Sequence, residues 1–386
     1  MRIAFDIRPL FDGNAFRGTG TYVRNLLQNL LAIDRTNEYL LIHEPVKEFQ
    51  SLPFADARVR YGRLPLFKPR FLSSREKWIW EYFHLSRLLR DEKVDLFHAT
   101  APVGPLKCGT PRVATCYDFI PLKYWDRGRS GLLSDARRRL RYRMALRSMR
   151  DADHLLAISA FTKDEAVRYL GVSPDKISVI PLGVSEAYRV RPDLIYYDEL
   201  KLRLRLQDPI ALYVGGADPR KNIPALIQAA AYLVRVRKLD FQLVIAGTPE
   251  ASIPDIQRLC AETGKLDNVR VTGILAEEDL VTLYNHARLF CFPSLEEGFG
   301  LPVLEAMACG LPVIAYRNVA VEEIAGTDAK LVADMEGAFY SAFEELLLND
   351  GVWEDYRKQG LIRAGRFTWK KTAEETLDAY ERIATR

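Results

Sequence analysis

The sequence LFCFPSLEEGFGLPVLEAMACGLPVI, residues 289–314, combines a strand pattern, a glycine-rich turn and the start of a helix. The apolar run 289–292 is typical of a strand buried in a parallel sheet. Gly298 and Gly300 permit a tight turn and a close approach of the backbone to a ligand. We expect a helix at about 301–309, whose first N–H groups lack intrahelical partners and whose dipole favours an anion. The segment therefore predicts a phosphate site at a helix start.

Two carboxylates flank this predicted phosphate site. Glu297 precedes the Gly-x-Gly turn, and Glu305 follows it inside the helix. A carboxylate accepts hydrogen bonds from paired hydroxyls, such as those of a ribose or a hexose. One carboxylate on each side of the site is suited to holding the two ends of a sugar nucleotide. The alternative is a purely structural turn followed by a solvated helical glutamate.

A second glycine-rich turn, GGADPRKN at residues 215–222, follows the apolar run 210–214. Ligands of open α/β sheets bind at the carboxyl ends of the strands, so Arg220 and Lys221 are expected at that edge. Two fixed cations there can stabilise charge on a departing nucleotide diphosphate. The alternative for such a pair is ordinary surface charge.

Short apolar segments alternate with helical patterns along the chain, which predicts parallel sheets of the α/β class. Strands are expected at residues 3–7, 39–43, 96–98, 113–116, 154–158, 177–180, 210–214, 242–246, 269–272, 289–292 and 313–315. Helices are expected at residues 22–33, 78–89, 132–149, 163–170, 224–236, 256–263, 277–286 and 302–309. Two such runs each begin with a strand and a glycine-containing turn, so we expect two Rossmann-like domains.

The length of 386 residues allows two domains, each with its own core. We place the first at residues 1–190 and the second at 191–366, because the pattern becomes irregular and polar near the boundary. No apolar run approaches the ~20 residues that span a bilayer, and the N-terminus is typical of a strand rather than a signal peptide. Five scattered cysteines predict free thiols and a cytoplasmic location.

The segment 289–314 resembles the E-x7-E signature of family 4 glycosyltransferases, which are retaining enzymes of the GT-B fold. Its Pro-Ser, Glu-Gly-Phe-Gly-Leu-Pro, second Glu and Cys-Gly-Leu-Pro-Val-Ile all fall in register. Residues 213–222 resemble the family's diphosphate-binding turn, residues 18–22 its first glycine turn, and residues 367–373 the beginning of its terminal helix. The resemblance covers nearly the whole chain and is strongest in the second half.

The resemblance implies two facing Rossmann-like domains with a central cleft. The first domain would take the acceptor, and the second would bind the nucleotide sugar. The helix within 367–386 would pack back on the first domain.

The resemblance also implies roles for individual residues. Glu297 would hold hydroxyls of the donor sugar, and Glu305 the ribose hydroxyls. Glu297, Lys221 and Arg220 would be the catalytic residues. The other donor-binding residues that it implies are Gly18, Tyr117, Asp118, Gly216, Ile274, Gly298, Phe299, Gly300 and Leu301.

Two positions depart from the family pattern. Tyr117 stands where the family has a histidine, so a titrating histidine is excluded there, although a tyrosine hydroxyl can still hydrogen-bond a sugar. Gly216 stands where many members have an arginine, and we expect Arg220 to take that role. Residues 151–153 match the D-x-D motif of metal-dependent glycosyltransferases. In a GT-B family we interpret it as chance, so we expect no cofactor and no divalent metal.

Seven arginines fall between Arg137 and Arg150, within the predicted helix 132–149. A solvated face, nucleic-acid binding and attraction to anionic lipid are the three interpretations. We find no nucleic-acid recognition motif and expect no such partner. Because acceptors in this family are often polyprenyl-linked, the resemblance favours peripheral contact with the inner membrane face. The stripe expected to pack on the sheet is Leu133, Ala136, Leu140 and Met144.

The expected activity is retaining, metal-independent transfer of a hexose from a nucleotide sugar to a glycan or lipid-linked acceptor in polysaccharide synthesis. UDP-glucose or another UDP-hexose is the favoured donor, and GDP-mannose is the alternative. A sugar-nucleotide 2-epimerase shares the fold but lacks the E-x7-E context. A nucleotide-sugar scaffold or sensor is the non-enzyme alternative. The chain lacks the G-x-G-x-x-G turn of a dinucleotide oxidoreductase.

Overall fold

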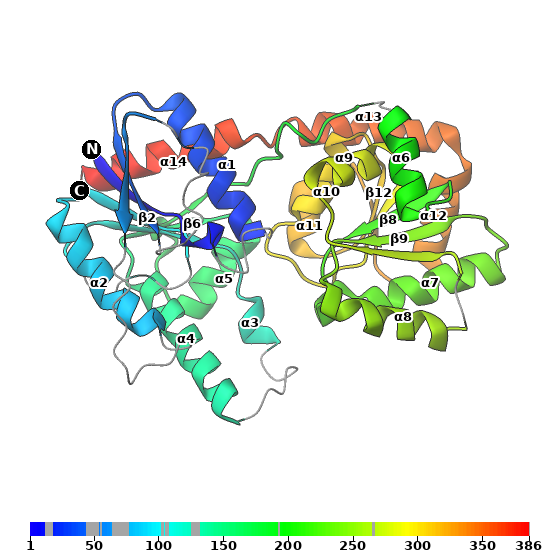
Figure 1. Cartoon of the computed structure of the whole chain (residues 1–386), viewed down its shortest axis with the longest axis horizontal. Helices are drawn as coiled ribbons and strands as arrows, with labels where there is room; N and C mark the ends of the chain where they lie inside the picture. Colours follow the sequence, from blue (N-terminus) through cyan, green and yellow to red (C-terminus); the bar gives the residue numbers. More distant parts are fainter. Residues whose placement is uncertain are drawn as a thin grey trace. The chain divides into compact units, whose positions relative to one another are not determined.

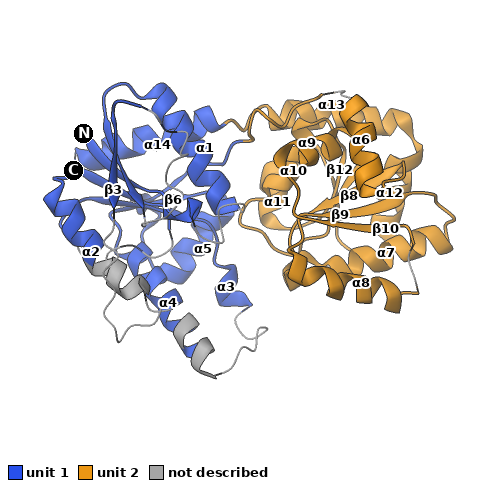
Figure 2. Ribbon diagram, in the orientation of Figure 1, with its two compact units in different colours: residues 1–183, 369–386 blue, residues 184–368 orange. Residues whose placement is uncertain are grey.

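The computed structural model describes residues 1–11, 18–43, 54, 56–63, 77–101, 104, 108–124, 132–191, 194–264 and 267–385. The chain divides into two compact units (Figure 2). Unit 1 comprises Met1–Gly183 and Trp369–Arg386, and unit 2 comprises Val184–Thr368. The chain thus changes unit at residues 183/184 and 368/369, rather than at the expected 190/191 and 366/367. The reason is local pairing, because Val184 and Thr368 form a β-bridge inside unit 2.

Unit 1 is built on a seven-stranded parallel sheet in the order β3-β2-β1-β4-β5-β6-β7. Its strands are β1 (Arg2–Asp6), β2 (Glu38–His43), β3 (Val59–Arg63), β4 (Leu96–Ala99), β5 (Arg112–Cys116), β6 (His154–Ala157) and β7 (Ile177–Val179). Its helices are α1 (Gly18–Ile33), α2 (Lys77–Asp91), α3 (Ile120–Lys123), α4 (Leu132–Arg150), α5 (Ala160–Leu170) and α14 (Trp369–Ala384). Strand β3 was not predicted, because this edge strand is mostly exposed and therefore lacks an apolar run.

Unit 2 is built on a six-stranded parallel sheet in the order β10-β9-β8-β11-β12-β13. Its strands are β8 (Ile210–Val214), β9 (Gln242–Ala246), β10 (Val269–Gly273), β11 (Leu289–Phe292), β12 (Val313–Tyr316) and β13 (Lys330–Val332). Its helices are α6 (Leu194–Leu204), α7 (Ile223–Arg235), α8 (Ile253–Glu262), α9 (Glu277–His286), α10 (Leu301–Ala308), α11 (Val319–Ala325), α12 (Gly337–Leu348) and α13 (Asp350–Ala364). The strand order reverses between β8 and β11, which creates a topological switch point in this sheet.

Helix α4 packs on unit 1 through a different face from the one expected. The predicted stripe is wrong, because Leu140 is 51% exposed while Ala145, Ser148 and Met149 are buried. Leu133 lies among residues whose side chains are outside the described part. The helix therefore turns an apolar residue outward among its arginines. No helix in the described ranges has the length and apolar character needed to cross a membrane.

Helix α14 returns to unit 1 and packs along α1 (Figure 1). Tyr380 of α14 is hydrogen-bonded through its hydroxyl to Nδ1 of the buried His98, at 2.5 Å. The other ring nitrogen of His98 lies 2.7 Å from Oγ1 of Thr115, which also contacts the hydroxyl of Tyr22 at 2.9 Å. Burial lowers the pKa of His98 to about 3, so this histidine is neutral. A buried polar chain therefore links the last helix to the middle of the sheet.

We expect Tyr380→Phe to destabilise the protein by about 1–3 kcal/mol, because it leaves Nδ1 of His98 buried without a partner. The measurement is urea unfolding followed by circular dichroism. Tyr232→Phe is the matched control, because Tyr232 is an exposed tyrosine whose hydroxyl has no hydrogen bond to another described residue. Equal unfolding midpoints for the two variants would contradict the prediction.

Candidate functional site

The loops that follow β8 and β11 meet at the switch point of unit 2. The backbone N–H of Leu295, after β11, donates a hydrogen bond of 2.8 Å to the carbonyl of Arg220, after β8. Both loops leave the carboxyl ends of neighbouring parallel strands. The residues that the sequence placed in two separate motifs therefore lie side by side.

A short 3-10 turn, Pro219–Lys221, fixes the two cations after β8. The side chain of Asp218 caps the turn by accepting a hydrogen bond of 3.1 Å from the backbone N–H of Arg220. Asn222 ends the turn in the left-handed region, with φ of 54°. The two consecutive cations are thus held by local backbone structure before any contact with the second loop is made.

Glu297 lies buried between these two cations. Lys221 donates from Nζ to Oε1 of Glu297 at 2.6 Å, and Arg220 donates from Nη1 to Oε2 at 2.7 Å. The hydroxyl of Ser294 also donates to Oε1. Arg220 reaches the carbonyl of Glu296 at 2.9 Å through the same Nη1. We refer to Arg220, Lys221, Ser294 and Glu297 as the switch-point cluster.

The switch-point cluster keeps its carboxylate ionised. Burial alone raises the pKa of Glu297, but the charges of Lys221 and Arg220 and the hydrogen bonds from Lys221 and Ser294 outweigh it, so the pKa lies below its usual value. Two half-buried cations face one buried carboxylate in the cluster. The exposed Asp218 is 3.6 Å from Nε of Arg220. The two cations outnumber the one buried carboxylate, and the charge of the exposed Asp218 is weakened by solvent, so the cluster suits an anionic ligand.

The glycine-rich turn after the cluster leads directly into α10. Gly300 adopts φ of +109°, where a residue with a side chain would be strained, and a Cβ would lie 3.1 Å from Cδ1 of Ile324. Helix α10 begins at Leu301 with no side-chain cap. Phe299 is buried with its ring edge against Phe367, at 6.2 Å between centroids. The helix start is therefore formed by backbone, as a phosphate site requires.

Glu305 lies in a different electrostatic environment from Glu297. The hydroxyl of Tyr284 donates to its Oε2 at 3.1 Å. Burial, with a smaller contribution from the charge of Glu277, raises the pKa of Glu305 to about 7, although the bond from Tyr284 opposes the shift. The two glutamates of the sequence motif thus have pKa values displaced in opposite directions. When Glu305 is ionised, both of its oxygens act as acceptors, and when it is protonated one of them also carries a donor.

The remaining predicted residues of unit 2 lie at the same edge of the sheet. Gly216 accepts a hydrogen bond of 2.9 Å from the hydroxyl of Tyr213 and has open space at its Cα. Ile274 follows β10 and is 61% exposed. Gly298 is buried within the turn. The structure therefore joins Arg220 and Lys221 to Glu297 by side-chain hydrogen bonds. The other predicted residues of unit 2 lie around these three, and no side-chain hydrogen bond joins Gly216 or Ile274 to the three among the described residues.

Three predicted residues belong to unit 1, and each has a local role there. Gly18 starts α1, so it belongs to the first helical turn rather than to the loop that was expected. Asp118 accepts a hydrogen bond of 3.0 Å from the backbone N–H of Ile120 and so supports the start of α3. The hydroxyl of Tyr117 is buried without a hydrogen-bond partner in the described residues, and its ring lies edge-on to Tyr22 at 5.4 Å.

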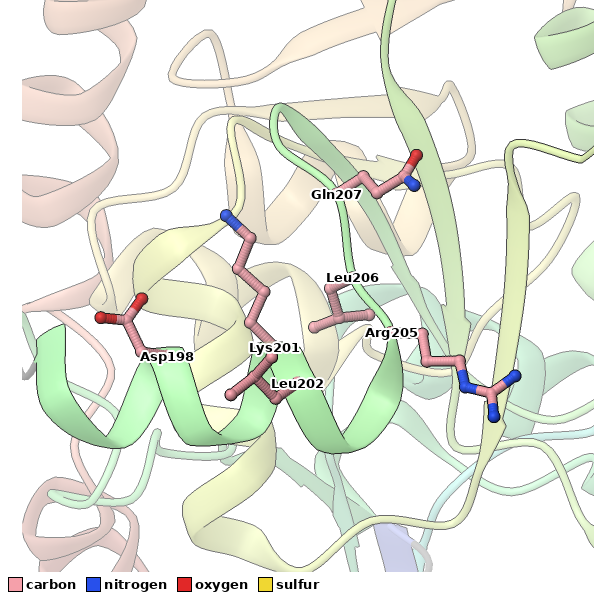
Figure 3. A pocket seen from close by; sticks show the side chains of 6 residues that line it. All are labelled: Asp198, Lys201, Leu202, Arg205, Leu206 and Gln207. Carbon is pink, nitrogen blue, oxygen red and sulfur yellow. The ribbon is translucent and has the colours of Figure 1, made fainter.

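Two contacts at the site were missed in the sequence. Ser294 stands three residues before Glu297 in the Pro-Ser of the motif, and this short spacing indicates that the two side chains can meet. Tyr284 offered none, because its contact with Glu305 arises from the packing of α9 against α10. An open pocket elsewhere in unit 2 precedes β8 rather than following it (Figure 3). It therefore lies at the strand ends where ligands of parallel sheets do not bind.

The two aspartates of the D-x-D sequence at residues 151–153 each have a partner within unit 1. Asp153 accepts a hydrogen bond of 2.7 Å from the backbone N–H of Arg112. Asp151 lies 3.4 Å from Nε of Arg150. Among the described residues, no group of three or more histidine, cysteine or acidic side chains is arranged to hold a metal ion.

Two family models match the chain. The model for Glycosyltransferase Family 4 matches residues 16–188, and the model for Glycosyl transferases group 1 matches residues 198–363. The chain belongs to glycosyltransferase family 4. The predicted family is therefore confirmed, and the switch-point cluster lies within the second match.

This family 4 chain is similar to several curated mannosyltransferases. It is 33% identical to the O-antigen chain mannosyltransferase B of Escherichia coli, over 61% of this chain and 62% of that protein. It is 31% identical to the serotype-specific mannosyltransferase WbdA of Escherichia coli, over 70% of this chain and 33% of that protein. It is 32% identical to the MMP alpha-(1->4)-mannosyltransferase of Mycolicibacterium hassiacum, over 63% and 57% respectively. The chain thus matches less than two thirds of the length of each.

Solved structures confirm the predicted GT-B fold. Sucrose-phosphate synthase from Thermosynechococcus elongatus aligns with a TM-score of 0.73 at 23% identity, over 99% of each chain. The Anabaena HepE protein, solved with UDP and glucose, aligns with a TM-score of 0.73 at 16% identity, over 99% of this chain and 100% of that one. WaaG, a glycosyltransferase involved in lipopolysaccharide biosynthesis, aligns with a TM-score of 0.72 at 15% identity, over 98% and 99%.

We expect Glu305→Gln to stabilise the unliganded family 4 chain at pH 8 and to have no effect near pH 4.5. The folded-state pKa of Glu305, about 7, lies above its ordinary value of 4.5, so the wild type loses stability as the pH rises between them. The expected gain is up to about 3 kcal/mol. Urea unfolding across this pH range measures it.

Glu262→Gln is the control for the pH series, because Glu262 is an exposed residue of α8 with no ion pair to another described residue. We expect it to follow the wild type at every pH. If the free energy of unfolding of E305Q has the same pH dependence as that of the wild type, the charge of Glu305 does not destabilise the folded state.

Proposed function

We propose that this protein transfers a hexosyl group from a nucleotide sugar, held in unit 2, to a hydroxyl of a glycan or lipid-linked acceptor. The transfer retains the anomeric configuration and uses no divalent metal. The observation that carries the proposal is the switch-point cluster, in which the two cations that follow β8 hold the buried Glu297 that follows β11. Membership in glycosyltransferase family 4 supports the reaction class.

The cations act on the leaving group. When the bond between the anomeric carbon and the phosphate oxygen breaks, its electron pair stays on the nucleoside diphosphate. Arg220, Lys221 and the start of α10 stabilise that charge. The acceptor oxygen bonds to the anomeric carbon on the same face, and a phosphate oxygen takes its proton. This route needs no general base, in keeping with a non-titrating Tyr117 where the family has a histidine.

Glu297 has one acceptor position left for the donor sugar. Among the described residues, its Oε1 accepts from Lys221 and Ser294, whereas Oε2 accepts from Arg220 alone. A carboxylate oxygen accepts two hydrogen bonds. Oε2 can therefore receive one sugar hydroxyl while the cations stay in place. Glu305, in its ionised form, would receive the ribose hydroxyls.

The identity of the donor is proposed on two grounds. The sequence favours a UDP-hexose such as UDP-glucose, and a structural neighbour was solved with UDP and glucose. GDP-mannose is the second candidate, because the curated relatives described above are mannosyltransferases by name. An acceptor from polysaccharide synthesis is favoured by the O-antigen chain named for one relative.

We expect Lys221→Ala to lower transfer about 10²–10³-fold, as the loss of one charge-stabilising donor does in other enzymes. The measurement is hexose transfer from UDP-glucose and GDP-mannose, with release of UDP or GDP as a second readout. Lys358→Ala is the control, since Lys358 is an exposed lysine of α13 in the same unit. Melting curves without ligand establish that each variant is folded. Nucleotide binding without release of nucleotide diphosphate under any condition would support a sensor or scaffold instead.

Peripheral contact with the inner face of the membrane is proposed for α4. Arg139, Arg141 and Arg143 are exposed around the exposed Leu140. Cations around an apolar residue are suited to an anionic lipid surface, where each contributes about 1 kcal/mol. The protein would then be cytoplasmic and close to a lipid-linked acceptor.

We expect vesicles with anionic lipid to carry the protein in flotation, and neutral vesicles to leave it behind. Replacing Arg139, Arg141 and Arg143 by serine should weaken the affinity for anionic vesicles about 100-fold, which corresponds to the loss of three surface cations. Equal recovery with both vesicle types would contradict membrane attraction by charge.

A further inference from the structure

Tyr284 of α9 holds Glu305 of α10 from the interior of unit 2. Its side chain is fully buried, and its hydroxyl donates a hydrogen bond of 3.1 Å to Oε2 of Glu305. Its ring packs edge-on to Tyr188 and obliquely to Phe290, at 5.8 and 5.5 Å between centroids. Contacts with two other rings in a close-packed interior leave the hydroxyl little freedom to move. Tyr284 is therefore a rigid donor aimed at one carboxylate oxygen.

Glu305 keeps acceptor capacity beside the bond from Tyr284. The residue is half-buried, and this bond is its one side-chain hydrogen bond among the described residues. An ionised carboxylate has about four acceptor positions, so most of them stay open after one bond is made. Two neighbouring hydroxyls of a ribose need only two. The bond from Tyr284 thus leaves room for both hydroxyls while it fixes the direction in which the carboxylate faces.

No cation forms an ion pair with Glu305 among the described residues. Strands β11 and β12, which pack on α10, carry no charged residue. Arg357 of α13, near the end of α10, pairs with Glu354 instead. The hydroxyl of Tyr284 is thus the described group that favours the charged form of Glu305. The other titratable groups that interact electrostatically with Glu305 are Glu277, Tyr188 and Cys309.

We infer that Tyr284 is a positioning residue, whose buried hydroxyl orients the carboxylate of Glu305 for the two ribose hydroxyls of the donor. The inference rests on the proposed function, in which Glu305 holds that ribose. A glutamate without such a contact rotates about its side-chain bonds, and ordering it during binding lowers the affinity. The bond from Tyr284 supplies this order before the donor arrives. Tyr284 acts through Glu305 alone, so its effect falls on donor binding rather than on cleavage of the glycosidic bond.

Steady-state kinetics with UDP-glucose and GDP-mannose separate donor binding from chemistry. Tyr284→Phe should raise the KM for the donor about tenfold near pH 7, because a hydrogen bond to a charged acceptor is lost, and should change kcat by less than about threefold. Calorimetric titration with UDP and GDP should show the same weakening in Kd. Phenylalanine keeps the ring between its neighbours, and melting curves without ligand establish that the variant is folded. A loss confined to kcat would overturn the inference.

The pH dependence of nucleotide affinity gives a readout that a purely structural role would not move. Wild-type affinity should fall as the pH drops through the pKa of Glu305, about 7, and E305Q should lack this fall. The bond from Tyr284 lowers that pKa, so in Tyr284→Phe the midpoint should move to higher pH. Titration of the nucleotide phosphates is common to all variants and cancels in the ratio of their Kd values. Weakening by the same factor at every pH would overturn the inference, and so would a wild-type profile identical to that of E305Q.

Tyr39→Phe is the matched control, because Tyr39 is buried in unit 1 and donates a hydrogen bond of 2.6 Å to the carboxylate of Asp34. It should change neither the KM for the donor nor the pH profile. In the E305Q background, Tyr284→Phe should leave the pH profile unchanged, since no carboxylate titrates there. Equal affinities and pH profiles in Tyr284→Phe and the wild type would overturn the inference and leave the proposed function intact. Absence of nucleotide binding by the wild type would instead refute the proposed function, and the inference with it.

Discussion

The carboxylate of Glu297, shared between Arg220 and Lys221, is the interaction on which the site depends. It joins the loop after β8 to the loop after β11 at the point where the strand order reverses. Two half-buried cations would repel each other without this carboxylate, and the buried carboxylate would be costly without them. Each loop therefore supplies what the other requires. The topology of the sheet brings the charges together, and the charges hold the two loops together.

The two glutamates of the motif are eight residues apart but do opposite things to the free protein. Glu297 has counter-charges, stays ionised and stabilises the folded state at neutral pH. Glu305 is desolvated and forms no ion pair with a cation among the described residues, so its charge destabilises the free folded state. In the proposed function Glu305 receives ribose hydroxyls, so it needs acceptor capacity that the free protein has not used. The cost of keeping Glu305 desolvated and ionised can be measured through its raised pKa.

Much of the fold and of the site was predictable, because it is encoded by local patterns. Apolar runs indicated most strands, and glycine turns at their carboxyl ends indicated where Arg220, Lys221 and Glu297 would converge. Features set by packing between distant segments were not predictable. The edge strand β3 has no apolar run, and Leu140 lies on the outer face of α4 despite its apolar character. The inward direction of the Tyr117 hydroxyl also depends on neighbours that its own segment does not specify.

The docking of α14 on unit 1 has a consequence for how the chain folds during synthesis. Domains generally fold in order as they leave the ribosome. Here the buried His98 near the middle of unit 1 needs Tyr380, which is made 282 residues later. Unit 2 is contiguous and can fold as soon as residue 368 has emerged, whereas unit 1 stays incomplete until α14 follows. The domain that is translated first is thus the one that finishes folding last.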